Sequence, residues 1–288
     1  MPTPWRLIYP GADLAFGPAA SGLPLSAAPE YGPTDLTVDD EDAARADGVN
    51  VGEDFRRGFT ITFTLHAYAA TQAEAKVLAG LFLRTWRGDG VRSAPGAVAE
   101  LKSPDGRSVF GRPRRAVVDE TLSRFGKYAI TADFTTVDDR WYGEPDELTV
   151  PLALSQGGGF VFPLRFPLAA RGYTTRANSF TVDGDQPTPW VVAEVRGAIL
   201  NPFVEVPGAF RWSAATSLAY DEWLTIDARP GRRCVLRNGE RIASLTRTSD
   251  SVDAGVLAPG AHSLILSGSS STGSPTATLS WRAANSIS

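Results

Sequence analysis

Alternating apolar and polar residues give the clearest strand predictions in the chain. Residues 59–65 place four apolar side chains on one face and three threonines on the other, and residues 127–134 alternate in the same way. Successive side chains of a strand point to opposite faces of the sheet, so each run predicts a half-buried strand. Shorter runs at residues 98–102, 108–110 and 116–118 predict further strands.

One segment among these strands has the pattern of a helix. Thr71 and Glu74 match a capping box, in which each side chain bonds a backbone N–H of the first turn. Apolar residues follow at helical spacing until two glycines end the helix, which we expect at about residues 71–87. We expect its apolar stripe to face the core of an α+β domain, with the helix packed on a β-sheet or split barrel. The stripe consists of Val77, Leu78, Leu81 and Phe82.

The second half of the chain has short apolar runs separated by turn residues. Asn238 and Gly239 between apolar flanks predict a tight hairpin, and we interpret Asn201-Pro202 as a break between strands. Residues 160–167 are apolar but contain two prolines, which suits an edge or wrapping segment. Many short strands at this spacing favour an antiparallel β-sandwich or jelly roll, so the chain as a whole is predicted to be mostly β.

A domain boundary is predicted after the stretch of residues 135–145. There a strand ends in an acidic pair and two bulky aromatics, and Gly143 and Pro145 follow. Proline cannot donate a hydrogen bond to a sheet and glycine weakens a strand, so we expect the pairing to end there. This places an N-terminal domain at residues 1–145 and a C-terminal domain at residues 146–288.

Composition and charge exclude several classes of function. The 288 residues are 43% hydrophobic and 21% charged, which is typical of a globular protein. A formal net charge of −4 gives no electrostatic footprint for nucleic acid or an anionic membrane surface. Cys234 is the single cysteine, which excludes an intrachain disulfide. The N-terminus lacks the pattern of a signal peptide and no run is long enough for a membrane span, so we expect synthesis in a reducing cytoplasm.

No group of residues supports a catalytic or cofactor site. His66 and His262 are interpreted as polar residues at strand ends, and Cys234 as an inert residue of an apolar strand. The carboxylates of Asp183 and Asp185 lack the spacing of a calcium loop. We therefore expect no catalytic residues, no metal and no cofactor. The one basic cluster, weak as a nucleic-acid signal, consists of Arg107, Arg112, Arg114 and Arg115.

Short motifs follow one another in a fixed order along nearly the full length of the chain. Each one alone is unspecific, and the order carries the information. In the first half they are Arg45-Ala-Asp-Gly48, Gly52-Glu-Asp54, the strand at 59–65, the helix ending in Trp86-Arg87, Gly111-Arg-Pro-Arg-Arg115 and Asp139-Arg-Trp-Tyr142. In the second half they are Phe162-Pro163, Phe166-Pro167, Gly184-Asp185, Pro189-Trp190, Gly197, Asn201-Pro202, Leu224-Thr-Ile-Asp227, Asn238-Gly239, Leu257-Ala-Pro-Gly260 and Leu279-Ser-Trp-Arg282.

In this order the motifs resemble the distal tail proteins of long-tailed bacteriophages (siphophages), called minor tail proteins in actinobacterial phages. The resemblance implies a β-rich N-terminal domain with one helix, followed by a galectin-like β-sandwich. It also implies a non-enzymatic ring, usually a homohexamer, at the tail tip of the virion. Such rings join the tail tube protein to the tape measure protein and to tail-tip or baseplate hub proteins, with the N-terminal domains in the ring and the C-terminal domains outward. The family has no catalytic residues to carry over.

A closed ring needs two different surfaces on each subunit, and the charges suggest a pair. We expect an acidic stretch to face basic residues of the neighbouring subunit. The acidic stretch is Asp39, Asp40, Glu41 and Asp42, and the basic residues are Arg112, Arg114 and Arg115.

Two other functions are compatible with the same pattern. One is a carbohydrate-binding or adhesin-type β-sandwich that contacts the host cell surface, for which Trp212 and Tyr220 are candidate aromatics, although packing roles suit both. The other is a secreted glycosidase, which the missing signal peptide disfavours. A glycan array tests the first alternative, and activity on polysaccharides tests the second.

Overall fold

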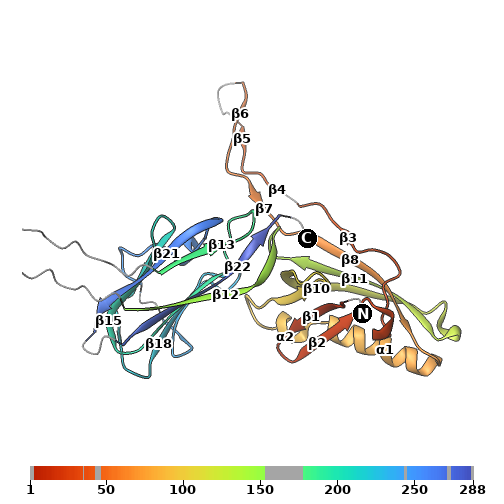
Figure 1. Ribbon diagram of the computed structural model, residues 1–288. Coiled ribbons are helices and arrows are strands. Elements are labelled where there is room, and N and C mark those ends of the chain that lie inside the picture. The colour runs from red at the N-terminus through yellow and green to blue at the C-terminus, as the bar shows by residue number, and fades with distance from the viewer. Residues whose placement is uncertain are drawn as a thin grey trace, which may run out of the picture. The chain divides into compact units, whose positions relative to one another are not determined.

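The computed structural model describes residues 3–34, 36–42, 47–152, 178–242, 245–270 and 274–286. The chain is mostly β, as the sequence predicts, and it divides into two compact units (Figure 1). Unit 1 is Met1–Glu144 with Asn285–Ser288, and unit 2 is Pro145–Ala284. Residues 160–167, interpreted above as an edge or wrapping segment, lie outside the described residues.

A curved antiparallel sheet forms the body of unit 1. The strands follow one another across the sheet in the order β2, β1, β9, β10, β11, β8, β3. Their bounds are β1 Trp5–Tyr9, β2 Ala12–Phe16, β3 Glu30–Tyr31, β8 Thr60–Tyr68, β9 Ala99–Lys102, β10 Ser108–Asp119 and β11 Lys127–Thr136. The predicted strands at 59–65 and 127–134 are therefore confirmed, and they pair with each other.

Residues 22–26 connect the two edges of this sheet into a split barrel. The Leu25 amide bonds the Gly17 carbonyl at 3.0 Å just beyond β2, and the Ser26 amide bonds the Thr64 carbonyl of β8 at 2.9 Å. Because both edges are satisfied by one short segment, the sheet encloses a core. The 3-10 turns η1 Ala19–Ser21 and η2 Ser123–Phe125 lie in loops of this unit.

Helix α1, Gln72–Trp86, packs on this sheet and confirms the predicted helix. Thr71 and Glu74 form the expected capping box, with the Glu74 amide 3.2 Å from Thr71 Oγ1. The predicted core stripe is wrong in two of its four positions, because Val77 is 71% exposed and Leu81 is 40% exposed. Small residues bring the helix close to the sheet, and they fix which side faces inward. The buried face consists of Ala75, Ala79, Phe82 and Trp86.

A second, very short helix follows α1. The sequence did not predict it, because the glycines after Trp86 indicate the end of a helix. Gly88 takes a left-handed conformation (φ 62°), and α2, Asp89–Arg92, begins directly after it. A β-carbon on Gly88 would lie only 2.8 Å from Pro113 Cγ in β10. Gly88 thus both turns the chain and lets it approach the sheet.

Aromatic rings fill the core of unit 1. Phe82 and Trp86 stack at 5.0 Å between ring centroids, and Phe16 meets the edge of Phe63 at 5.1 Å. Trp5 packs edge-on to Phe63 at the same distance. Rings of this size bury the largest apolar area per residue, so this cluster is the principal source of stability of the unit.

β10 corrects the prediction of two strands at 108–110 and 116–118. It is one strand that pairs with β11 on both sides of a register shift between Pro113 and Ala116. Proline lacks an amide hydrogen, so it is tolerated at such a bulge. Apolar periodicity stops at a bulge, and for that reason the sequence pattern suggested two elements.

Two antiparallel sheets that share a buried apolar cluster make unit 2 a β-sandwich, as predicted. One sheet has the order β12, β22, β14, β18, β19, β20, and the other β13, β21, β15, β16, with β17 paired to β15. The bounds are β12 Trp141–Pro151, β13 Asn178–Val182, β14 Val191–Arg196, β15 Ile199–Val206, β16 Phe210–Ser213, β17 Ser217–Leu218, β18 Trp223–Asp227, β19 Cys234–Arg237, β20 Glu240–Arg241, η3 Val252–Ala254, β21 Gly260–Ser269 and β22 Thr276–Asn285.

Three local predictions for this half are corrected or confirmed. β12 includes Gly143 and Pro145, so these residues do not end the strand. Asn201-Pro202 is a bulge inside β15 and not a break, since Asn201 has φ 49° and the register shifts between Leu200 and Phe203. The Asn238-Gly239 hairpin is confirmed: both residues have positive φ (50° and 85°), as a tight two-residue turn between β19 and β20 requires.

The capping box of α1 gives a first prediction. Thr71→Ala removes the side chain that satisfies the Glu74 amide, and we expect it to lower the free energy of unfolding by about 1 kcal/mol. Thr71→Ser keeps the hydroxyl and serves as the control. Urea unfolding of both variants checks this, and equal stability of Thr71→Ala and the wild type would contradict it.

Candidate functional site

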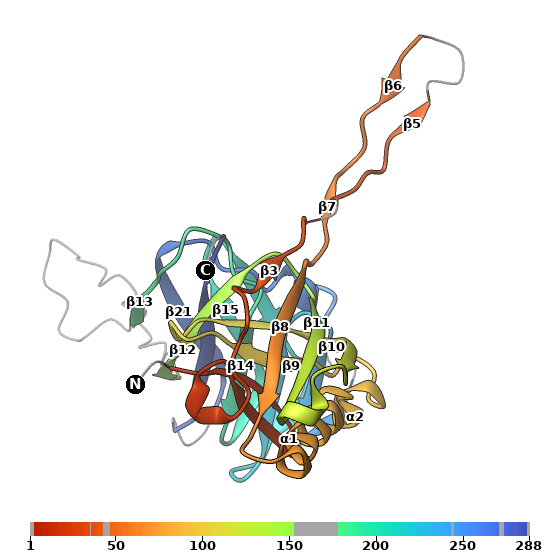
Figure 2. The same cartoon turned by 90° about the vertical axis from the view of Figure 1, so that its right-hand side faces the viewer.

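A two-stranded ribbon, which we call the arm, projects from unit 1 between β3 and β8 (Figures 1 and 2). It comprises the described residues 36–42 and 47–56 and carries β4 Leu36–Thr37, β5 Glu41–Asp42, β6 Val49–Asn50 and β7 Phe55–Arg56. β4 pairs with β7 and β5 with β6. Figure 1 shows the arm leaving unit 1 on the side away from α1.

The apolar residues of the arm are exposed to solvent. A ribbon of two strands has no second layer, so neither of its faces can be buried within the unit. Five large apolar side chains on it are between 53% and 84% exposed, and Val51 is the extreme. An exposed apolar patch of this kind marks an interaction surface. The five are Leu36, Val38, Val49, Val51 and Phe55.

The arm is also strongly acidic. Between residues 36 and 56 the sequence has seven acidic side chains and two arginines. The four predicted interface carboxylates all lie here and are exposed, and Asp40 Oδ1 accepts a hydrogen bond from the Gly52 amide at 2.9 Å. That bond ties the two strands of the arm together. The four are Asp39, Asp40, Glu41 and Asp42.

An aromatic cluster holds the base of the arm. The Trp141 ring lies 6.0 Å from that of Tyr31 and 6.2 Å from that of Phe59, the residues that flank the arm in sequence. Thr136 reinforces the contact, because its hydroxyl accepts from the Phe59 amide at 2.8 Å and donates to the Asp138 carbonyl at 2.7 Å. Both ends of the arm are thus attached to the same point of the barrel.

A buried carboxyl shapes the turn next to this cluster. Tyr142 donates its hydroxyl hydrogen to Asp138 Oδ2 at 2.5 Å, and the Arg140 amide donates to Asp138 Oδ1 at 3.3 Å. Burial raises the pKa of Asp138, against the opposing effect of these hydrogen bonds. Burial likewise raises the pKa of Tyr142, so the phenol keeps the proton that it donates.

Polar contacts continue this attachment into the arm. Arg56 pairs with Asp139 at 3.2 Å, and Arg57 Nε, just beyond the end of the arm, donates to Thr37 Oγ1 of β4 at 2.7 Å. Gly58 lies between them and Phe59, and a β-carbon there would collide with the backbone of Thr136. Since Arg56 is largely exposed, we count its ion pair as a minor contribution and the aromatic cluster as the main one.

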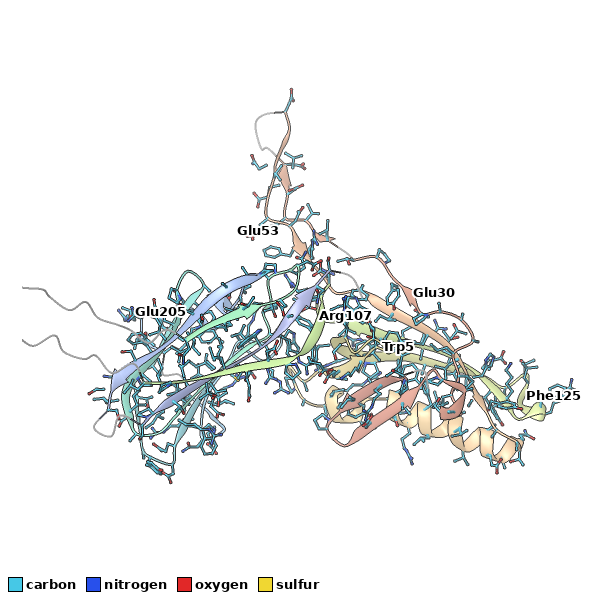
Figure 3. The ribbon with its side chains drawn as sticks, viewed as in Figure 1. Trp5, Glu30, Glu53, Arg107, Phe125 and Glu205 are labelled. Atoms are coloured by element: carbon cyan, nitrogen blue, oxygen red, sulfur yellow. The ribbon has the colours of Figure 1, made fainter. Side chains whose placement is uncertain are left out.

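The predicted basic residues do not act as one group. Arg112 is half-buried, and its guanidinium donates to the carbonyls of Ala97 and Ala94, both at 2.9 Å. Arg114 and Arg115 are exposed at the bulge of β10. The structure therefore leaves two of the three arginines available to a partner. Figure 3 shows Arg107 on unit 1, where it lies 3.9 Å from Asp105.

The residues weighed for chemistry are scattered through the described chain. His66 is half-buried in β8, where burial and then Lys127 lower its pKa, and His262 Nε2 contacts the Ala258 carbonyl at 2.7 Å. Cys234 is half-buried and not fully buried. No cluster of three metal-ligating side chains occurs among the described residues. No helix in that part of the chain is long and apolar enough to span a bilayer.

The two candidate aromatics for glycan binding differ sharply. Trp212 is completely buried and stacks on Phe210 at 4.0 Å between ring centroids, so it is a core residue of unit 2. Tyr220 is 80% exposed. A single exposed ring is ordinary for a protein surface.

The arm is the feature that sequence reasoning missed. Asp47-Gly48 predicts its turn, and Gly48 has φ 118°, but the short apolar runs on either side suggest ordinary strands of a sheet. The available signal was the acidic surroundings of those runs, since Leu36 and Val38 stand next to four consecutive carboxylates. Apolar residues in such a setting favour an exposed ribbon over a core strand.

Comparison with known proteins identifies the fold. No family model and no curated protein matches the chain. Among solved structures, the chain is similar to the Dit protein of phage SPP1, a hub of the adsorption apparatus in phages that infect Gram-positive bacteria, with a TM-score of 0.56, 13% identity and coverage of 96% of this chain and 98% of that one. It is also similar to a chain of the phage P2 baseplate in its activated conformation, with a TM-score of 0.57, 11% identity and coverage of 99% of both. At such identity the likeness shows a shared fold.

Asp138 gives a pH-dependent prediction. Its pKa is raised in the folded state, so the folded chain holds a proton to higher pH than the unfolded chain, and this group's contribution to stability falls as pH rises through that window. We therefore expect the stability of Asp138→Asn relative to the wild type to increase as pH rises above the ordinary carboxyl pKa of about 4. Urea unfolding over a series of pH values measures the difference.

Asp119 provides a control, because the effect of pH on its contribution to stability has the opposite sign to that of Asp138. Hydrogen bonds from Thr121 lower the pKa of this exposed carboxyl. Its favourable contribution is present above the unfolded pKa and is lost as pH falls, so Asp119→Asn should lose stability relative to the wild type as pH rises. Parallel trends in the two variants would contradict the assignment of Asp138 as a carboxyl that burial disfavours.

Proposed function

We propose that this protein is a structural component of a long-tailed bacteriophage and forms the distal hub ring of the tail. The observation that carries the proposal is the full-length fold match to SPP1 Dit and to a chain of the P2 baseplate, which covers at least 96% of this chain in each case. A match of this coverage extends over both units of the chain, which supports a likeness of the whole chain and not of one common β-sandwich.

In this proposal residues 1–145 form a homohexameric ring and residues 146–288 project outward from it. The ring joins the tail tube protein to the tape measure protein and to the hub protein of the tail tip, and it has no enzymatic activity. The exposed arm supports self-association: a ring needs heterologous contacts, and an apolar, acidic ribbon that protrudes from the subunit suits one half of such a contact.

The native mass of the purified protein tests the ring. We expect a particle of about six times the chain mass of 30.7 kDa in light scattering, with a central hole in negative-stain images. Replacement of residues 38–51 by a short Gly-Ser linker removes the outer part of the arm, including β5 and β6, and leaves the barrel core untouched, so we expect a folded monomer. A wild-type monomer at every protein concentration would overturn the proposal.

The pairing of arm and arginines is tested by charge reversal. We propose that the arm carboxylates face Arg114 and Arg115 of a neighbour, so the double change to glutamate should weaken the ring. Arg112 is left unchanged, because its guanidinium holds the carbonyls of Ala94 and Ala97. Reversal of Arg241, an exposed arginine of unit 2, is the control. An unchanged ring mass for the Arg114 and Arg115 variant would reject this pairing.

A further inference from the structure

We infer that the arm of one subunit docks on the outer face of helix α1 in the next subunit. This inference rests on the proposed ring and names the surface that receives the arm. The receiving surface consists of the solvent-facing side of α1 and the two exposed arginines at the bulge of β10. Two independent features of that surface, its apolar centre and its positive border, match the arm.

The outer face of α1 has an apolar centre that nothing covers within the described chain. Val77 and Leu81 lie one helical turn apart and are 71% and 40% exposed. Gly80 stands beside them, and a β-carbon there would meet no atom within 4 Å. Residues three or four apart form a continuous strip on a helix, so the three make one shallow apolar surface.

Cations border this surface. Lys76 precedes Val77, and Arg84 and Arg87 lie on the turns that follow Leu81. All three are exposed, and none forms an ion pair in the part of the chain that the structure describes. The acidic residue of the first turn, Glu74, is occupied by the capping box.

The bulge of β10 extends the positive border beyond the end of the helix. Arg92 of α2 donates to the carbonyls of Pro113 and Arg114 at 3.0 and 2.9 Å. These bonds bring the exposed Arg114 and Arg115 next to the C-terminal end of α1. Cations here also suit the negative end of the helix dipole.

The arm has the complementary chemistry. It offers apolar side chains of the right size, Val49 and Val51 among them, flanked by carboxylates. Its carboxylates Glu41 and Asp42 form no ion pair within the described residues. Opposite charge around an apolar contact steers the encounter and fixes the register of the two surfaces.

The position of the arm excludes docking on helix α1 of the same subunit. The arm leaves unit 1 on the side away from α1, as two views at right angles show (Figures 1 and 2). Two complementary surfaces on different sides of one subunit cannot satisfy each other within that subunit. They can do so head to tail between copies, which is the contact that closes a ring.

Charge exchange tests the contact. Arg84→Glu with Arg87→Glu, and separately Glu41→Lys with Asp42→Lys, should each raise the midpoint concentration of ring formation by about tenfold. The four changes together should bring the midpoint back toward the wild-type value, because opposite charges then face each other again. Val77→Glu should weaken the ring, whereas Phe125→Glu, at the far tip of unit 1 in Figure 3 and 63% exposed, should leave it intact.

Chemical crosslinking tests proximity without relying on stability. In a Cys234→Ser background, cysteines introduced at Val51 and Leu81 should be joined between chains by a short bis-maleimide, giving a ladder of covalent multimers on a denaturing gel. Chains with one of the two cysteines, or with the pair at Val51 and Phe125, should remain monomeric on that gel.

The outcomes separate this inference from the proposed function. If the wild type forms a ring, the helix variants form rings of the same mass, and no crosslinked ladder appears, the docking surface is overturned. The proposed hub ring is then unaffected. A wild-type monomer overturns both. Crosslinking that yields only an internally joined monomer places the arm on its own helix and also overturns the inference. A wild-type ring, recovery of ring formation in the fourfold charge-exchange variant and a ladder of crosslinked multimers together support the inference.

Discussion

The packing of Trp141 against Tyr31 and Phe59 is the contact on which the attachment and direction of the arm depend. These residues come from three distant parts of the chain, and they meet where the arm leaves the barrel and where β12 begins. A ribbon without a core has no stability of its own, so its direction is set by this attachment. The same cluster closes one end of the aromatic core, through the edge-on contact of Trp141 with Trp5 at 6.4 Å.

Next to the cluster lies a buried carboxyl that opposes folding but fixes the geometry of a turn. Asp138 is nearly inaccessible to solvent, and burial of a carboxylate opposes folding. In return its two oxygens fix the Tyr142 hydroxyl and the Arg140 amide, which defines the tight turn between β11 and β12. An apolar residue would remove the cost but also the carboxyl that accepts both of these hydrogen bonds.

The sequence predicted individual helices, strands and turns better than it predicted what these elements pack against. The capping box at Thr71, the hairpin at Asn238-Gly239 and the alternation in β8 each depend on neighbouring residues alone, and each was predicted correctly. The errors concern what lies beyond the element. Periodicity does not say which of two apolar stripes on α1 meets the sheet, so Val77 and Leu81 were placed inside. It also cannot distinguish a bulge from a strand end, as at Pro113 and Asn201, or a projecting ribbon from an internal hairpin. The predicted interface carboxylates are exposed, whereas Arg112 serves its own loop.

The acidic character of the arm has a second consequence, for the time before any ring exists. A free ribbon has unpaired backbone groups along its outer edges and so offers a template on which an identical ribbon could add. Four consecutive carboxylates at 39–42 give every arm the same sign of charge, so two arms that approach edge to edge repel each other. The residues proposed to select the correct neighbour would therefore also keep newly made subunits from aggregating through their arms.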